Sequence, residues 1–273
     1  MDYLVGLIIG GVLGLTGAGG SVFAVPLLIY LIHLSPQDSI GISLGAVCIS
    51  SIFGVLTRLK TGQIEWLPAI VYSGIGGIFS PLGVYLNQQI NEMLLMVGFS
   101  GLVIVVAMRL WLQASRTPLE TKTVRSSISE DGADNSALCR TNHNAPFEIG
   151  VRCIAGMSAA AIATGVLSGL FGVGGGFLIV PTLLFLTSIS IQQAVATSLV
   201  VISVVSLSGF VSYLVAGSTV DINLLSHVAI GGVFGMGCGI AVSRYVAGPM
   251  LQKIFSVLML IMAVVTVSTH ILN

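Results

Sequence analysis

Two glycine-rich stretches interrupt apolar segments of this sequence. Gly14–Pro26 reads GLTGAGGSVFAVP, and Gly169–Pro181 reads GLFGVGGGFLIVP. Glycine is a poor helix former and readily adopts a positive φ, so each stretch predicts a break within a helix. A helix that begins after such a break has first-turn N–H groups without intrahelical partners, and its dipole attracts anions. Each stretch therefore predicts an anion site; close helix packing is the alternative role for the glycines.

Hydroxyl side chains accompany both stretches. Ser43 and Ser198 follow them at corresponding positions, and Ser203–Ser208 adds hydroxyls further along. A hydroxyl can donate a hydrogen bond to an oxyanion, but a helical serine also bonds to a carbonyl one turn earlier. The sequence supports both interpretations. The candidate substrate-binding residues are Thr16, Gly17, Gly19, Gly20, Ser21, Ser43, Gly172, Gly174, Gly175, Gly176, Thr197 and Ser198.

The segments that carry these residues are those of a membrane protein. Of the 273 residues, 55% are hydrophobic and 7% are charged, whereas soluble domains carry about 25% charged residues. This composition predicts an all-α polytopic membrane protein, and its net charge of zero argues against nucleic acid as a partner. Apolar segments run at about 3–34, 40–57, 66–86, 93–112, 150–188, 192–215, 222–243 and 250–272.

The two halves of the chain are copies of each other. A shift of 155 residues places Gly14 on Gly169 and Gln37 on Gln192, and the register continues without a gap to Phe79. A polar segment rich in Ser, Thr, Asn and Asp separates the copies. We predict a first membrane repeat at residues 1–112, a flexible linker at 113–149 and a second membrane repeat at 150–273.

The basic residues bear on the orientation of the two repeats, because Lys and Arg favour the cytoplasmic side of a membrane. If residues 3–34 and 150–188 each bend back at their glycines, all ten Lys and Arg residues are cytoplasmic. If 150–188 crosses once, Arg244 and Lys253 lie outside. This favours an inverted repeat, in which each half is a broken or re-entrant helix pair followed by three transmembrane helices. The linker is then cytoplasmic.

The apolar segments contain no arrangement of residues that supports catalysis. They hold no Ser/His pair, no paired carboxylates and no His/Glu metal spacing, so we expect no enzyme, no metal site and no cofactor. The carboxylates Asp38, Glu65, Glu92 and Asp221 lie at segment ends. His227, about one turn into its segment, is a candidate proton carrier, and a structural histidine at the membrane interface is the alternative.

The paired stretches resemble the sulfite exporter family TauE/SafE. The resemblance rests on G-L-x-G-x-G-G-[GS]-x-x-x-V-P in each half and on QQAVATSL at Gln192–Leu199. It covers nearly the whole chain outside the linker. The first half departs from the second, because it reads QDSIGISL and has Ser21 in place of Gly176. The resemblance implies a small bacterial or archaeal inner-membrane protein with duplicated halves, associated with export of sulfite, sulfoacetate or related sulfur oxyanions.

These features lead us to expect a secondary transporter that exports small sulfur-containing anions across the inner membrane by alternating access. A passive anion channel is one alternative, because the two breaks could form a filter. A carrier of another small carboxylate or anion is the other. The expected partners are a small anionic substrate and the lipid bilayer, with the proton as a candidate coupling ion. The sequence is compatible with a monomer and with a dimer.

Overall fold

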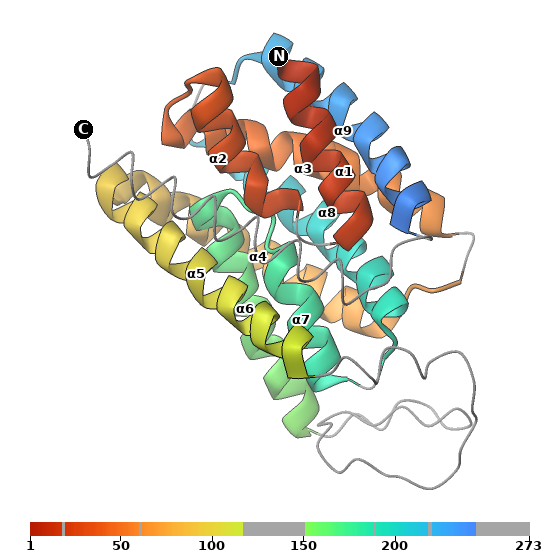
Figure 1. The fold of residues 1–273 in the computed structure, drawn as a ribbon. Coiled ribbons are helices and arrows are strands. Elements are labelled where there is room, and N and C mark those ends of the chain that lie inside the picture. Colours follow the sequence, from red (N-terminus) through yellow and green to blue (C-terminus); the bar gives the residue numbers. More distant parts are fainter. Residues whose placement is uncertain (18–19, 60–61, 117–150, 188, 218–219, 244–273) are drawn as a thin grey trace, which may run out of the picture.

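The structure is a bundle of helices, as the composition predicts. The computed structural model describes residues 1–17, 20–59, 62–116, 151–187, 189–217 and 220–243, which form nine helices (Figure 1). The helices are α1 (Asp2–Thr16), α2 (Gly20–Ile32), α3 (Pro36–Leu59), α4 (Trp66–Gln89), α5 (Glu92–Arg116), α6 (Val151–Phe171), α7 (Gly176–Leu186), α8 (Ile191–Val215) and α9 (Ile222–Ser243).

Five helices are long and apolar enough to cross a membrane by length and composition. These are α3, α4, α8 and α9 over most or all of their length, and α6 over Cys153–Phe171. The helices α1, α2 and α7 have 15, 13 and 11 residues, whereas a crossing needs about 20. The prediction of an all-helical, multi-pass membrane protein is confirmed for the described residues.

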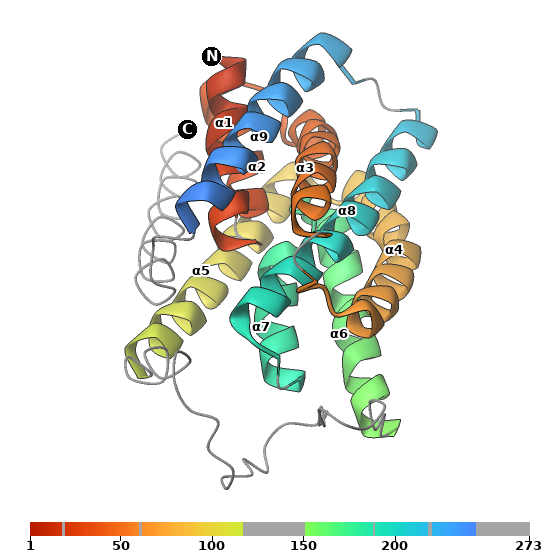
Figure 2. The same ribbon diagram turned by 90° about the vertical axis from the view of Figure 1, so that its right-hand side faces the viewer.

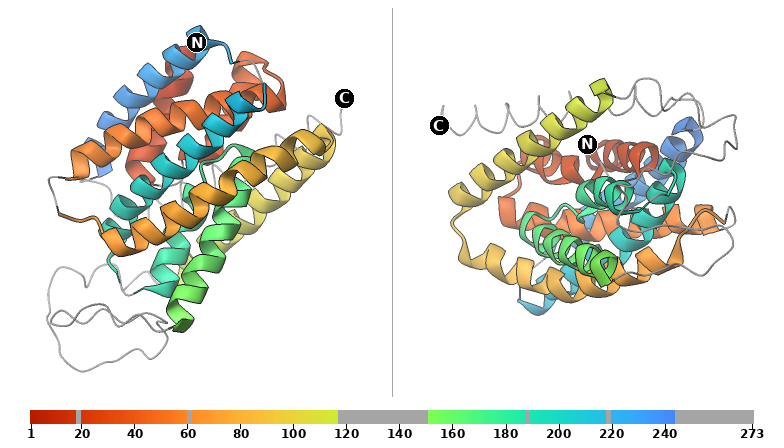
Figure 3. Two further views of the ribbon diagram at one scale, coloured as in Figure 1. Left: turned by 180° about the vertical axis from the view of Figure 1, so that it is seen from behind. Right: turned by 90° about the horizontal axis from the view of Figure 1, so that it is seen from below.

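Part of the predicted organisation lies outside the described residues. This applies to most of the linker at 113–149, to the apolar segment at 250–272, and to Arg244 and Lys253. The domain boundaries therefore stay predictions. Among the described helices, α5 runs along the edge of the bundle when the molecule is seen from below (Figure 3).

The two halves pack against each other more than within themselves. Under the shift of 155 residues, α1, α2, α3 and α4 correspond to α6, α7, α8 and α9. The two closest helix pairs are α1 with α9 and α6 with α4, which lie in opposite parts of the bundle (Figure 2), and α3 contacts α8. When the halves are exchanged, the first two contacts map onto each other, and the contact of α3 with α8 maps onto itself. The packing therefore follows the internal duplication.

Glycines allow α1 to lie directly against α9. A Cβ atom placed on Gly10 would contact the carbonyl oxygen of Gly232, and one placed on Gly14 would contact that of Met236. Small residues are typical of such close contacts between membrane helices, since only they let the backbones approach. Because later residues of α1 meet later residues of α9, the two helices run parallel.

The same contact recurs between α6 and α4. A Cβ atom on Gly165 would meet the carbonyl oxygen of Gly76, and one on Gly169 would meet that of Ser80. The order of the contacts again shows parallel helices. In both pairs, the helix that leads into a glycine break is held by the fourth helix of the other half. These contacts fix the position of each break in the bundle.

Substitutions at these glycines test the packing. We expect Gly10→Ala to lower the free energy of unfolding by about 2 kcal/mol or more, because its methyl group overlaps the backbone of Gly232. Gly74→Ala in α4 is the control, since no atom lies within 4 Å of its added Cβ, and it should be neutral or stabilising by up to about 1 kcal/mol. Unfolding in mixed detergent micelles measures both, and equal effects would contradict the contact.

Candidate functional site

The break in the second half is built from glycines with left-handed backbone. The helix α6 ends at Phe171, and φ is 67° at Gly172, 64° at Gly174 and 66° at Gly175. Other residues adopt such angles only with strain, which explains why the position requires glycine. Gly175 is the N-cap of α7 and supplies no side chain to bond the first-turn N–H groups. The predicted break is confirmed here.

The first half breaks at the corresponding position. Gly17 ends α1 with a φ of 71°, and its N–H donates to the carbonyl oxygen of Leu13 at 2.7 Å. The next described helix, α2, begins at the predicted candidate Gly20, which is buried. Gly19, another candidate, lies outside the described residues. The break predicted in this half is therefore also present.

A serine of each half bonds the break of the other half. The Ser43 hydroxyl donates to the carbonyl oxygen of Gly172 at 2.6 Å, and the Ser198 hydroxyl donates to that of Gly17 at 2.9 Å. Ser43 corresponds to Ser198, and Gly17 corresponds to Gly172, so the two bonds are equivalent. Both serines are fully buried. The two breaks thus share one reciprocal pair of hydrogen bonds.

The same two hydroxyls also lie near carbonyl oxygens of their own helices. Ser43 Oγ lies 3.0 Å from the carbonyl oxygen of Ile40, and Ser198 Oγ lies 2.9 Å from that of Val195. The local bonding that the sequence offered as an alternative is therefore present. A hydroxyl has one proton, and in this structure carbonyl oxygens engage it. Ser43 and Ser198 accordingly hold the breaks in place.

The remaining hydroxyl candidates occupy three different places. Thr197 Oγ1 accepts a hydrogen bond from the backbone N–H of Glu65 at 3.0 Å, which joins α8 to the start of α4. Thr16 Oγ1 donates to the carbonyl oxygen of Val12 at 2.8 Å within α1. Ser21 is fully buried in the first turn of α2. Ser21 is thus the hydroxyl candidate at the start of the helix after the first break.

Two serines at the second break are absent from the list of candidate substrate-binding residues, although Ser206 belongs to the hydroxyl-bearing stretch Ser203–Ser208. Ser206 Oγ lies 2.7 Å from a Cβ atom placed on Gly174, and Ser168 Cβ lies 3.4 Å from one placed on Gly175. Both serines are fully buried, and neither hydroxyl has a hydrogen-bond partner among the described residues. Ser206 follows Ser198 by about two helical turns, a spacing that places both on one face of α8. This spacing is the feature of the sequence from which Ser206 could have been predicted as a residue of the site.

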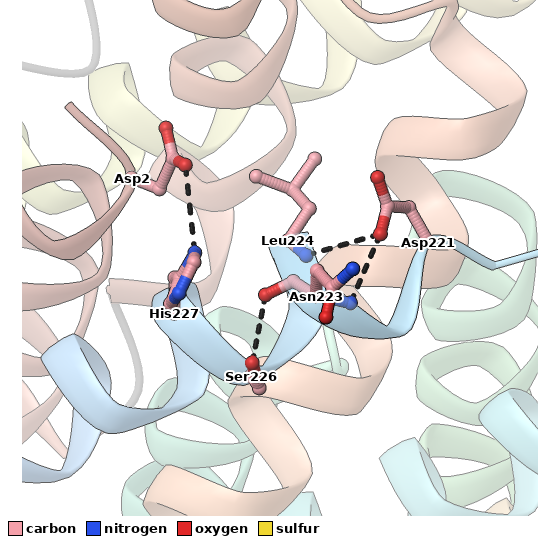
Figure 4. A network of polar contacts seen from close by, with 6 residues as sticks. All are labelled: Asp2, Asp221, Asn223, Leu224, Ser226 and His227. Carbon is pink, nitrogen blue, oxygen red and sulfur yellow. Dashed lines mark hydrogen bonds and ion pairs between the residues drawn. The ribbon is translucent and has the colours of Figure 1, made fainter.

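A separate group of polar contacts lies near the starts of α1 and α9. His227 Nδ1 is 3.8 Å from Asp2 Oδ2, with side chains 41% and 36% exposed (Figure 4). The His227 ring also lies 4.7 Å from that of Tyr3. Asp221 caps α9 by accepting hydrogen bonds from the N–H groups of Asn223 and Leu224. The position of His227 matches the interfacial alternative, and in the described part of the chain no contact connects it to a glycine break.

A comparison of the whole sequence decides the family. The sequence profile of the family described as sulfite exporter TauE/SafE matches residues 3–266. This chain belongs to that family. The match extends across both halves, both glycine breaks and the segment between them.

Relatives of this TauE/SafE chain are named as transporters. It is 28% identical over 262 residues to a "probable membrane transporter protein" of Xylella fastidiosa, covering 95% of this chain and 91% of the relative. It is 29% identical over 252 residues to the "probable membrane transporter protein YunE" of Bacillus subtilis, covering 88% and 87%. No solved structure is significantly similar to it. Family, relatives and apolar helices together support a multi-pass membrane transporter.

The reciprocal serine bonds give a stability prediction for this TauE/SafE protein. We expect Ser198→Ala to lower the free energy of unfolding by about 1–3 kcal/mol, because it leaves the buried carbonyl of Gly17 without its donor. Ser43→Ala should have an effect of the same size through Gly172. Unfolding in mixed micelles measures both.

Ser50→Ala is the matched control. Ser50 is also buried and donates to the carbonyl oxygen of Ala46 at 2.8 Å. That carbonyl keeps its helical N–H partner when the hydroxyl is removed, so the loss should be under about 1 kcal/mol. A loss at Ser50 as large as that at Ser198 would contradict the role assigned to the reciprocal bonds.

Proposed function

We propose that this protein is a secondary transporter that exports small sulfur-containing anions, such as sulfite or sulfoacetate, across the inner membrane by alternating access. The observation that carries the proposal is the pair of helix breaks, each bonded by a serine of the opposite half. Discontinuous helices that meet between two repeats are the usual substrate site of secondary transporters. The helix that starts at each break offers N–H groups to an anion.

The contacts of α3 and α8 support opposite orientations of the two repeats. The Tyr213 hydroxyl, near the end of α8, donates to Asp38 Oδ1, near the start of α3, at 3.4 Å. Gln193, near the start of α8, donates to Glu65 Oε1, just after the end of α3, at 2.8 Å. The two corresponding helices therefore run antiparallel. This arrangement is the one that an inverted repeat requires.

A contact at the centre of the bundle supports the same arrangement. Cys48 Sγ of α3 lies 3.6 Å from the carbonyl oxygen of Ser203 in α8. Cys48 and Ser203 are corresponding residues under the shift of 155. Corresponding residues contact each other where a two-fold axis passes between them. Exchange of the halves about such an axis converts an opening on one side of the membrane into an opening on the other, which is the basis of alternating access.

A carrier fits the described packing better than a continuously open pore. Val173, within the second break, is fully buried, as are Leu44, Leu199 and Ile202 on the two central helices. Substrate passage past these side chains requires a change of structure, and such a change limits the rate of each transport cycle. Flux through a carrier therefore saturates with substrate concentration, and that behaviour distinguishes it from a pore.

Flux of radiolabelled sulfite into proteoliposomes tests the transport proposal. Wild-type protein should give saturable flux above that of empty liposomes. Gly174→Ala should reduce it at least tenfold, because the methyl group enters the break beside Ser206. Gly62→Ala is the matched control: φ is 65° at Gly62 and 64° at Gly174, but no atom lies within 4 Å of the Cβ added at Gly62. Both variants carry similar backbone strain, so only the effect of crowding differs.

Two outcomes would contradict the proposal. If folded wild-type protein moves neither sulfite, thiosulfate, sulfoacetate nor taurine under any imposed gradient, it is not an exporter of sulfur anions. If the two alanine variants lose equal amounts of flux at equal folded abundance, the break is not the site of transport. Flux with and without a pH gradient identifies the proton as the coupling ion or excludes it.

Cysteine labelling tests the inverted orientation and the cytoplasmic position of the linker. In a variant without natural cysteines, Gln63→Cys should react with a membrane-impermeant thiol reagent only from the cytoplasmic side. Asn223→Cys, near the start of α9, should react only from the outside, because α8 separates these two positions. Reaction of both residues from the same side would contradict the inverted repeat.

A further inference from the structure

We infer that the break between α6 and α7 is the binding site for a single monovalent oxyanion, and that the break between α1 and α2 is not an equivalent site. The inference rests on the proposed function and narrows its substrate class: hydrogen sulfite, the monoanion of sulfite, meets it, whereas sulfoacetate, with two negative charges, does not. It starts from the two buried serines that lie beside Gly174 and Gly175.

Ser206 presents an unpaired donor to this break. Its hydroxyl is fully buried, has no partner among the described residues, and faces Gly174. Ser168, on α6, is equally buried and unpaired, and lies beside Gly175. A buried hydroxyl without a partner destabilises the protein, since it has lost its hydrogen bonds to water. An anion that accepts from both hydroxyls would remove that cost, and this is the reason to place the anion here.

The backbone adds donors at the same point. The first turn of α7 follows directly after Gly175. The N–H of Leu178 donates to the carbonyl oxygen of Gly175 at 3.1 Å, whereas helix geometry provides no intrahelical acceptor for the N–H groups of Gly176 and Phe177. A left-handed residue next to one of negative φ, as Gly174 is next to Val173, turns successive N–H groups toward a common point, which is a recurrent anion-binding arrangement. Two hydroxyls and a set of N–H groups suit a ligand with several terminal oxygens, such as a sulfonate, hydrogen sulfite or a carboxylate.

The first break lacks these hydroxyls. Leu13 stands at the position that corresponds to Ser168. Ser51 corresponds to Ser206, but its hydroxyl already donates to the carbonyl oxygen of Cys48 at 2.9 Å. Neither position offers a free donor to an anion. Ser21, at the start of α2, already has a contact. Among the described residues, the buried serine hydroxyls without a partner therefore lie at the second break.

The charges of the described residues favour a monoanion over a dianion. The described arginines are Arg58, Arg109, Arg116 and Arg152, and each lies within about two turns of an outer helix end. The break at Gly172–Gly176 and the adjoining turns of α6 and α7 contain no Lys or Arg that could neutralise a ligand. The cost of moving an ion out of water rises with the square of its charge, so neutral donors alone compensate a dianion poorly.

Methanesulfonate and sulfate test this inference, because they are tetrahedral oxyanions that differ in charge. Titration calorimetry on the full-length protein in detergent should give a dissociation constant at least tenfold lower for methanesulfonate than for sulfate. Ser206→Ala should raise the dissociation constant of methanesulfonate about tenfold to hundredfold, because it removes a hydrogen bond to a charged group. Ser168→Ala should act in the same direction and serves as the second variant.

Melting temperatures separate a binding role from a structural one. Without anion, Ser206→Ala should melt at the same temperature as wild type or higher, because it removes an unpaired buried hydroxyl. The matched control Ser51→Ala removes, from the corresponding position, a hydroxyl that bonds within its own helix, so its melting temperature should change little. The anion-induced rise in melting temperature should be lost in Ser206→Ala and retained in Ser51→Ala.

Each contrary result overturns a stated part of the proposal. If wild type binds methanesulfonate and Ser206→Ala and Ser168→Ala both bind it equally well, the site is elsewhere and the transport proposal stands. If sulfate binds as tightly as methanesulfonate, the selection for a monoanion is wrong. If neither anion binds while the protein transports sulfite in liposomes, the inference fails alone. If the protein also transports no sulfur anion, the proposed function fails with it.

Discussion

The constraint on which this structure depends is the need to pair backbone groups where a helix breaks inside a membrane protein. Lipid offers no hydrogen bonds, so a carbonyl released by a break needs a partner from the protein. Ser43 provides one for Gly172, and Ser198 provides one for Gly17. The glycines at the breaks also bring the backbone close to the partner half, where a Cβ atom on Gly172 would contact Ile40. The breaks are thus stabilised across the interface of the halves.

This constraint makes the two halves dependent on each other. Each break is bonded by the third helix of the other half, and each helix that enters a break lies along the fourth helix of the other half. One repeat alone has neither the serine donor nor the glycine-lined helix that its own break requires. A change at one break therefore alters groups that belong to the opposite repeat. That mutual dependence is the physical link that the proposed alternating access needs.

The sequence predicts some of these features and not others, for physical reasons. The breaks at Gly17 and Gly172–Gly175 are predicted because a positive φ is a local demand that glycine meets. The corresponding serines are also visible as a repeated pattern. Their acceptors are not, because the bond from Ser198 to Gly17 joins residues 181 positions apart, and only the packing of the halves brings them together.

Ser168 shows a further limit of reasoning from repeats. Comparison of the halves directs attention to positions where both carry the same residue. Ser168 is aligned with Leu13 under the shift of 155 residues, so this comparison passes over it. A residue that bonds the backbone at a break has an equivalent task in each half, so both halves carry the same residue at that position. A substrate that binds once needs its donors at one break only. In a duplicated transporter, the residues that differ between the halves are therefore the better candidates for binding, and the residues that agree are the better candidates for holding the breaks in place.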